Sequence, residues 1–257
     1  MLSEEQIQRY ARQIILPELG PAGQRKLSQA KALCVGVGGL GSPAALYVAA
    51  AGVGTLGLVD PDPVELSNLH RQILHSSSDL GRPKVFSAKA KLQALEPRLS
   101  VKAHPFRLEP ANIAALFSEY DVVLDGSDNF ETRYMVNDTC VRLGIPLVSG
   151  AVMRWEGQVM TVLPKKSPCY RCAFPESPEP GCAQSCSEAG VLGALCGVIG
   201  SLQAAEAVKT LLGRSDLLTG RLLIFDLLNM RMREKTFRKN PGCSACGTAR
   251  PLDSPVY

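Results

Sequence analysis

The sequence predicts a doubly wound, mostly parallel α/β sheet, extended by antiparallel strands. Two observations carry this prediction. Over the first 150 residues, short apolar segments alternate with helical segments, which is the βαβ pattern. A glycine-rich loop, Gly36 to Gly41, follows the first apolar segment and opens a helix, as in Rossmann-like folds.

The N-terminal segment predicts an amphipathic helix that precedes the sheet. Ser3 followed by Gln6 resembles a capping box, and apolar residues then recur at helical spacing. These are Ile7, Tyr10, Ala11, Ile14 and Ile15. We expect residues 1–30 to form a helical arm.

Five strands and their connecting helices are expected next. The strands are predicted at residues 32–37, 55–60, 100–104, 122–125 and 146–149. The helices are predicted at residues 44–51, 83–95, 110–117 and 130–143. Ser42 and Pro43 suit the N-cap and first position of the first helix, and Gly52 its end. We therefore expect residues 31–150 to form a nucleotide-binding half.

The alternation stops after Gly150, within what we expect to be one domain of 257 residues. Strands are predicted at residues 157–163, 221–226 and 230–237, around a long helix at 191–212. That helix begins with an uncharged run, but Glu206 and Lys209 interrupt it too early for a membrane span, so it predicts a buried helix. Residues 175–189 have the composition of an exposed mobile loop.

Composition limits the classes of partner. The chain is 46% hydrophobic with a formal charge of +4 and no run of basic residues, so we expect neither a nucleic-acid nor a membrane partner. The acidic N-terminus lacks the regions of a secretory signal, which predicts a cytoplasmic protein with reduced thiols.

The glycine loop predicts a nucleotide site. In Gly36-x-Gly38-x-x-Gly41, backbone N–H groups and a helix N-terminus can approach phosphate oxygens, and Asp60 at the end of the second strand can hold ribose hydroxyls. The alternative is a glycine turn needed only for packing. These features alone favour an NAD or FAD enzyme.

The residues beyond the second strand indicate a triphosphate instead. Asn68, Arg71 and Lys84 lie where the chain can fold back over phosphates, and two cations there stabilise charge that moves between oxygens during transfer. The alternative for Arg71 or Lys84 taken singly is a solvated surface charge.

A second acidic segment, Ser127-Asp128-Asn129, follows the fourth strand at the edge where open α/β sheets bind ligands. Asp128 is a candidate Mg²⁺ ligand, because Mg²⁺ prefers carboxylate and phosphate oxygens together. The alternative is that Asp128 or Asn129 caps the helix that begins near Phe130.

Nine cysteines in a reduced chain favour metal ligands or buried side chains over disulfides. The two pairs Cys169-x-x-Cys172 and Cys243-x-x-Cys246 predict a structural, four-thiolate Zn²⁺ site. Three others, Cys34, Cys140 and Cys196, fall in apolar runs and are predicted to be buried. Cys182 and Cys186 lie in the proline-rich loop, where they are either reactive thiols or incidental.

Taken together, these motifs resemble the MoeB/ThiF family of ubiquitin-activating-type adenylyltransferases. The motifs are Arg9-Tyr10-x-Arg12-Gln13, the glycine loop, Asp60-x-Asp62, Leu66-Ser67-Asn68-Leu69-x-Arg71-Gln72, Gly81-x-Pro83-Lys84, Ser127-Asp128-Asn129, the two cysteine pairs and Glu188-Ala189-Gly190-Val191. The resemblance covers nearly the whole chain in the family's order.

The resemblance implies a homodimeric enzyme with structural zinc that uses ATP to adenylate the C-terminal glycine of a small ubiquitin-like sulfur carrier. Roles carried over by position place Gly41 at the phosphates, Asp60 at the ribose, Asn68, Arg71 and Lys84 along the phosphate chain, and Asp128 near Mg²⁺. The other residues expected to bind the nucleotide are Gly38, Gly39, Asp62, Ser127 and Asn129. It implies that Arg12 enters the other subunit's site, that Cys186 matches a loop cysteine some members use in sulfur transfer, and that residues 151–257 bind the carrier.

The chemistry fits the residue types. A terminal carboxylate, with a pKa of roughly 3.5, is already ionised at neutral pH, so its attack on the α-phosphorus of ATP needs no general base. We expect no rhodanese domain, so sulfur would come from a separate donor, a cysteine desulfurase or a rhodanese. The competing interpretations are an NAD(P)-dependent dehydrogenase and a non-catalytic adaptor for ubiquitin-like proteins. Carriers for molybdopterin, thiamine and transfer-RNA thiolation all stay open.

Overall fold

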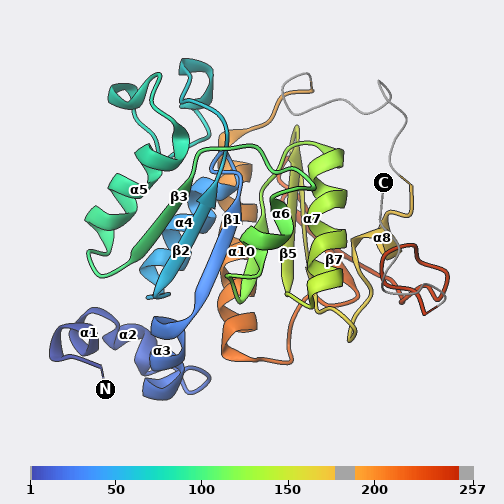
Figure 1. The fold of residues 1–257 in the computed structure, drawn as a ribbon, viewed down its shortest axis with the longest axis horizontal. Coiled ribbons are helices and arrows are strands. Elements are labelled where there is room, and N and C mark those ends of the chain that lie inside the picture. Colours follow the sequence, from blue (N-terminus) through green and yellow to red (C-terminus); the bar gives the residue numbers. More distant parts are fainter. Residues whose placement is uncertain (1, 177–188, 249–257) are drawn as a thin grey trace.

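The computed structural model describes residues 2–176 and 189–248. One eight-stranded sheet crosses them in the order β3-β2-β1-β4-β5-β6-β7-β8 (Figure 1). The parallel strands are β1 (Lys31–Val35), β2 (Thr55–Val59), β3 (Ser100–His104), β4 (Val122–Asp125) and β5 (Leu147–Met153). The strands β6 (Glu156–Val162), β7 (Arg221–Asp226) and β8 (Arg231–Thr236) continue the sheet in antiparallel pairing. The predicted fold class is confirmed.

Helices cover both faces of the sheet. On one face lie α4 (Gly41–Ala50), α5 (Lys84–Leu95) and α10 (Gly193–Leu212), and on the other α6 (Ile113–Phe117) and α7 (Phe130–Leu143). Side chains of β1 alternate between two hydrophobic clusters: Ala32 and Cys34 pack on the α4 and α10 side, and Leu33 and Val35 on the α6 and α7 side. Burial on both faces is why this strand is apolar from Ala32 to Val35.

The helix after the glycine loop begins two residues earlier than predicted. Its N-cap is Leu40 and Gly41 is already helical, so the predicted cap at Ser42 is wrong. Gly41 packs against the loop, where an added Cβ would lie 2.0 Å from the Gly36 carbonyl oxygen. Only glycine allows the helix to start this close to the loop. Gly52, with φ +85°, follows the helix end as predicted.

The N-terminal arm consists of α1 (Glu4–Arg9), α2 (Ala11–Ile14) and α3 (Gly20–Gln29), below the sheet in Figure 1. The capping box of Ser3 and Gln6 is confirmed. The expected single helix is broken at Tyr10, whose buried hydroxyl donates a 2.7 Å hydrogen bond to the Glu96 carboxylate. Tertiary contact with the end of α5 outweighs the helical pattern here.

The later elements position the far side of the site. Strand β5 runs four residues beyond its predicted end, because it pairs with β6 up to Met153. A short helix, α8 (Tyr170–Ala173), packs on α7, and the turns η1 (Leu66–Asn68) and η2 (Ser77–Asp79) lie between β2 and α5.

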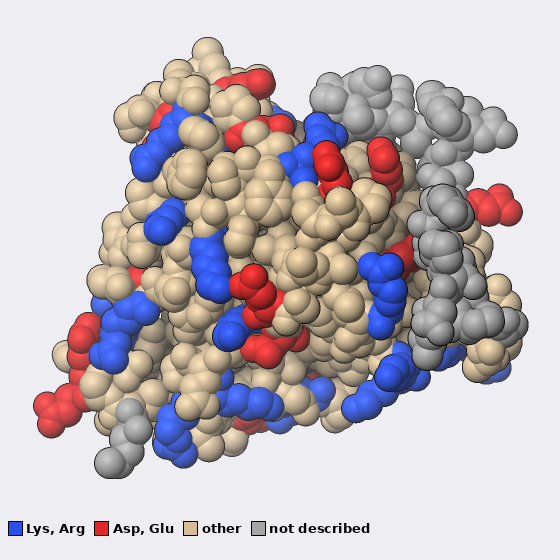
Figure 2. All heavy atoms as spheres, viewed as in Figure 1, with Lys and Arg blue, Asp and Glu red and all other residues tan. Residues whose placement is uncertain are grey.

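Helix α10 has the length and hydropathy of a membrane span, but it packs on the sheet and on α4, and half of its most apolar window is buried. Figure 2 shows basic and acidic side chains interspersed over one face of the molecule.

Candidate nucleotide and metal sites

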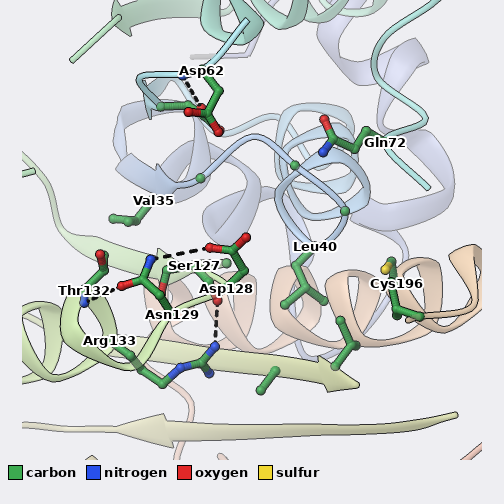
Figure 3. A pocket seen from close by; sticks show the side chains of 18 of the residues that line it. Val35, Leu40, Asp62, Gln72, Ser127, Asp128, Asn129, Thr132, Arg133 and Cys196 are labelled. Atoms are coloured by element: carbon green, nitrogen blue, oxygen red, sulfur yellow. Dashed lines mark hydrogen bonds between the residues drawn. The ribbon is translucent and has the colours of Figure 1, made fainter. Parts of the chain in front are cut away.

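A cavity of about 350 Å³ opens at the carboxyl ends of the parallel strands. It lies where the strand order reverses between β1 and β4, the position at which open α/β sheets bind ligands. Loops after β1, β2 and β4 form its wall (Figure 3). The predicted residues that line it are Gly38, Gly39, Asp60, Asp62, Arg71, Lys84, Ser127, Asp128 and Asn129.

The glycine loop is held from both sides at Val37. The Val37 N–H donates to Asp60 Oδ2 at 2.8 Å, and the Val37 carbonyl accepts from His75 Nε2 at 3.0 Å. Because a carbonyl only accepts, His75 Nε2 carries the proton and Nδ1 accepts from the Ser87 hydroxyl at 2.9 Å. A Cβ at Gly39 would lie 2.9 Å from Cys196 Sγ. The loop is therefore fixed in shape and leaves room only for glycine.

Two acids and a lysine meet at the end of β2. Lys84 Nζ lies 3.0 Å from Asp62 Oδ2 and 4.0 Å from Asp60 Oδ1. Burial raises the pKa of the Asp60 carboxyl, while the Lys84 ammonium and the N–H groups of Val37 and Asp62 oppose the increase. Lys84 is itself buried, so its charge is available to the cavity and little screened by water.

The turn after β2 presents Arg71 to the cavity. Arg71 Nη1 donates to the Ser67 carbonyl at 2.9 Å and lies 3.0 Å from His70 Nε2. Asn68 is buried and does not line the cavity; its carbonyl accepts from the N–H groups of Arg71 and Gln72. In this conformation Asn68 shapes the turn that carries Arg71. Gly41 is also behind the wall, packed on Gly36.

In the segment after β4, one residue caps helix α7 and its neighbour presents a carboxylate to the cavity. Asn129 is the N-cap of α7, and its Oδ1 accepts from the Thr132 N–H at 2.9 Å. Asp128 is exposed on the cavity wall, where Asn129 Nδ2 approaches its Oδ1 at 3.4 Å. The carboxylate of Asp128 can therefore face a ligand while its neighbour ends the helix.

Several contributions to the wall were not predicted from the sequence. Arg133 is buried within the first turns of α7, Gln72 is buried beside Gly38, and Phe106, Arg107 and Leu108 come from the loop after β3. A cation near a helix N-terminus opposes the helix dipole, which was the one available signal for Arg133. The Oε1 atom of Gln72 is buried without a hydrogen-bond partner among the described residues.

The four cysteines of the two CxxC pairs form one cluster beside α8. Their Sγ atoms lie within 4.8 Å of one another, with 3.6 Å between Cys169 and Cys243 and 3.4 Å between Cys172 and Cys246. Tetrahedral Zn²⁺ with Zn–S bonds of about 2.3 Å requires similar spacing. Burial raises the pKa of the Cys169 thiol and raises that of the Cys246 thiol to about 11, whereas the N–H groups of Cys246 and Ala245 lower the pKa of Cys243 despite its burial. The thiolates of Cys169 and Cys246 therefore need a bound cation. The Asn240 N–H points at Cys172 Sγ. These residues fit a metal ion.

The remaining predicted residues lie elsewhere. Arg12 is exposed on α2 and is not part of the cavity wall. Cys34, Cys140 and Cys196 are buried as predicted, Cys196 with its thiol behind Gly39. Cys182, Cys186 and Glu188, and most of the predicted mobile loop, lie outside the described residues.

Known proteins are similar to this chain in sequence or in fold. The chain is 50% identical over 250 residues to the sulfur carrier protein adenylyltransferase of Thermus thermophilus, covering 95% of this chain and 92% of that protein. It is 48% identical to the SAMP-activating enzyme E1 of Haloferax volcanii, covering 96% and 91%. The crystal structure of E. coli MccB with MccA-N7isoAsn has a TM-score of 0.83 at 24% identity, covering 93% and 75%, and shares the fold.

The family model agrees with these relatives in extent. It is the model of the ThiF family, and it matches residues 10–245, from the N-terminal arm to the second cysteine pair. The match therefore includes every segment that lines the cavity. The chain belongs to the ThiF family.

Proposed function

We propose that this protein uses ATP and Mg²⁺ to adenylate the C-terminal glycine carboxylate of a ubiquitin-like sulfur carrier protein. One observation carries the proposal: Asp60, Arg71, Lys84 and Asp128, from four separate segments, line a single cavity behind a rigid glycine loop. The names of the bacterial and archaeal relatives point to the same class of reaction and partner.

The cavity offers what this reaction requires. Asp60 accepts ribose hydroxyls, the glycine loop offers N–H groups to phosphates, and Arg71 and Lys84 balance the phosphate charge. A carboxylate oxygen of the carrier attacks the α-phosphorus, the bond to the bridging oxygen breaks, and pyrophosphate leaves with its electron pair. Mg²⁺ held at Asp128 would neutralise charge on the phosphates. No step needs a base, and a mixed anhydride with AMP remains.

We propose a cytoplasmic homodimer in which Arg12 of each subunit adds a third cation to the partner's cavity, because Arg12 is exposed and outside its own. The cysteine cluster holds structural Zn²⁺. Cys186 takes part in sulfur transfer after adenylation, with sulfur supplied by a separate donor protein, a cysteine desulfurase or a rhodanese.

Mass spectrometry tests the proposal. The purified protein is incubated with ATP, Mg²⁺ and each candidate carrier of the molybdopterin, thiamine and transfer-RNA thiolation types. We expect at least one carrier to gain the mass of an AMP group, and a carrier without its C-terminal glycine to gain none. If every carrier keeps its mass while the protein is folded and binds ATP, the proposed function is wrong.

A further inference from the structure

Arg133 is a buried cation that the chemistry above does not use. Its side chain comes from α7 and lines the cavity, yet Arg133 is only 7% exposed. The guanidinium donates from Nη1 to the Gly150 carbonyl at 2.8 Å and from Nη2 to the Ser127 carbonyl at 2.6 Å. A guanidinium has five N–H donors, so these bonds leave three for a ligand.

No carboxylate of the described residues forms an ion pair with Arg133. The buried acid two residues before Ser127 is Asp125, but its Oδ1 accepts from the Ser127 N–H and hydroxyl, and its Oδ2 from the Ser149 hydroxyl. The Tyr170 ring lies 6.0 Å from the guanidinium carbon and is neutral. A buried cation without an anionic contact is costly, and an anion that enters the cavity lowers that cost.

The position of Arg133 indicates which anion that is. Arg71 and Lys84 lie on the β2 side of the cavity, with the glycine loop and Asp60. Arg133 instead bridges the loop after β4 to Gly150 on β5, beside Tyr170 of α8. Figure 3 shows its hydrogen bond to the loop after β4. The wall also includes Val152 and Met153 of β5 and Gln158 of β6. Arg133 thus lies on the β4 and β5 side of the cavity, across from Asp62 and Gln72 on the β2 side.

We propose that Arg133 binds the C-terminal carboxylate of the carrier protein before adenylation and holds it beside the α-phosphate, an inference that rests on the proposed function. The carboxylate is charged before attack and becomes a neutral acyl group afterwards. Arg133 therefore binds the unreacted C-terminus of the carrier more tightly than the adenylated C-terminus. Its loss raises the carrier's Kd and KM more than it lowers kcat.

Two forms of one carrier test this inference. The carrier that accepts AMP in the assay above is prepared with its natural C-terminal carboxylate and with a C-terminal carboxamide, and each Kd is measured by calorimetry without ATP. We expect the wild-type protein to bind the carboxylate about tenfold or more tightly than the carboxamide, since a charge-assisted hydrogen bond is at stake. In Arg133→Gln this preference disappears, and Arg133→Lys keeps part of it.

The ratio of the two affinities separates recognition from a structural role. If Arg133 only supports the loops at Ser127 and Gly150, its replacement weakens both carrier forms and ATP alike, and the ratio persists. Arg142→Gln is the matched control, because Arg142 is exposed in the last turn of the same helix. A carboxylate preference that survives in folded Arg133→Gln overturns the inference while leaving the proposed function intact. Absence of AMP transfer by the wild-type protein would contradict both the inference about Arg133 and the proposed function.

Discussion

Lys84 lies between the two acids that follow β2, with its ammonium 3.0 Å from the Asp62 carboxylate and 4.0 Å from that of Asp60. Asp62 is exposed, whereas Asp60 and Lys84 are buried. A phosphate that enters the cavity can replace Asp62 as the partner of Lys84 without moving the lysine into water. Lys84 is therefore preorganised for a polyanion.

We predict that Lys84→Ala lowers carrier-dependent ATP–pyrophosphate exchange by roughly 10²-fold or more, because one preorganised cation is lost from the phosphates. Arg71→Ala is expected to behave alike. Exchange of labelled pyrophosphate into ATP measures both. Lys89→Ala, on the same helix but away from the cavity wall, is the control and should retain wild-type exchange. Wild-type exchange rates in the Lys84 and Arg71 variants would show that these two side chains do not act on the phosphates.

The adjacent residues Asp128 and Asn129 should separate activity from stability. Asp128→Ala is expected to lose exchange with an unchanged Tm, because its carboxylate faces the cavity and does not cap α7. Asn129→Ala is expected to lower the free energy of unfolding by about 1 kcal/mol, the usual cost of a lost N-cap, with exchange retained. Exchange assays and urea unfolding of both variants check this; the reverse assignment of effects would contradict it.

Metal removal should destabilise the protein. We predict one Zn²⁺ per chain by elemental analysis, and a lower Tm after treatment with a chelator, because four thiolates join distant segments through one ion. Cys169→Ser should have the low Tm without treatment and should not respond to the chelator. Equal melting of the wild-type protein with and without chelator, at full metal removal, would show that the cluster does not contribute to stability.

The buried His75 predicts a loss of stability in mild acid. Burial lowers its pKa, and the positive charges of Lys91 and Lys84 lower it further. The hydrogen bond to the Val37 carbonyl and the negative charge of Asp79 oppose this decrease. The unfolded chain titrates this histidine near pH 6.5, so below that pH it binds a proton that the folded protein resists. The free energy of unfolding therefore decreases as the pH is lowered below about 6.5, by at most about 1.4 kcal/mol per pH unit for one histidine.

His75→Gln should reduce this pH dependence between pH 7 and 5 in urea unfolding. It should not abolish it, because burial also lowers the pKa of His104. His70→Gln is the control, since His70 is exposed. An identical pH dependence in His75→Gln and the wild-type protein would show that protonation of His75 is not coupled to unfolding.

Local signals predicted most of the elements. The bounds of β3, β4, α7 and β7 agree with the predicted ranges, because period-two or helical patterns end there at turn residues such as Gly144. The loops after β1, β2 and β4 were assigned to the site because the carboxyl ends of parallel strands meet at one edge.

Other features depend on specific tertiary and loop contacts rather than on a repeating pattern. The break at Tyr10 follows from its bond to Glu96, and the early start of α4 from the packing of Gly41 on Gly36. Arg133 has an ordinary place in a helical pattern, and only the fold brings it to Ser127 and Gly150. Such contacts leave no periodicity in the sequence.

The cysteine cluster also bears on the last strand of the sheet. Strand β8 is an edge, pairs only with β7, and exposes all six of its residues. Little apolar burial holds β8 in place, yet Cys243 follows closely and packs with Cys169 in the hydrophobic cluster that contains the edge-to-face pair of Tyr134 and Tyr170. A bound ion would thus cross-link the segment that follows this edge strand to the body of the domain. Without it, fraying would begin at β8, and amide hydrogens there would exchange first.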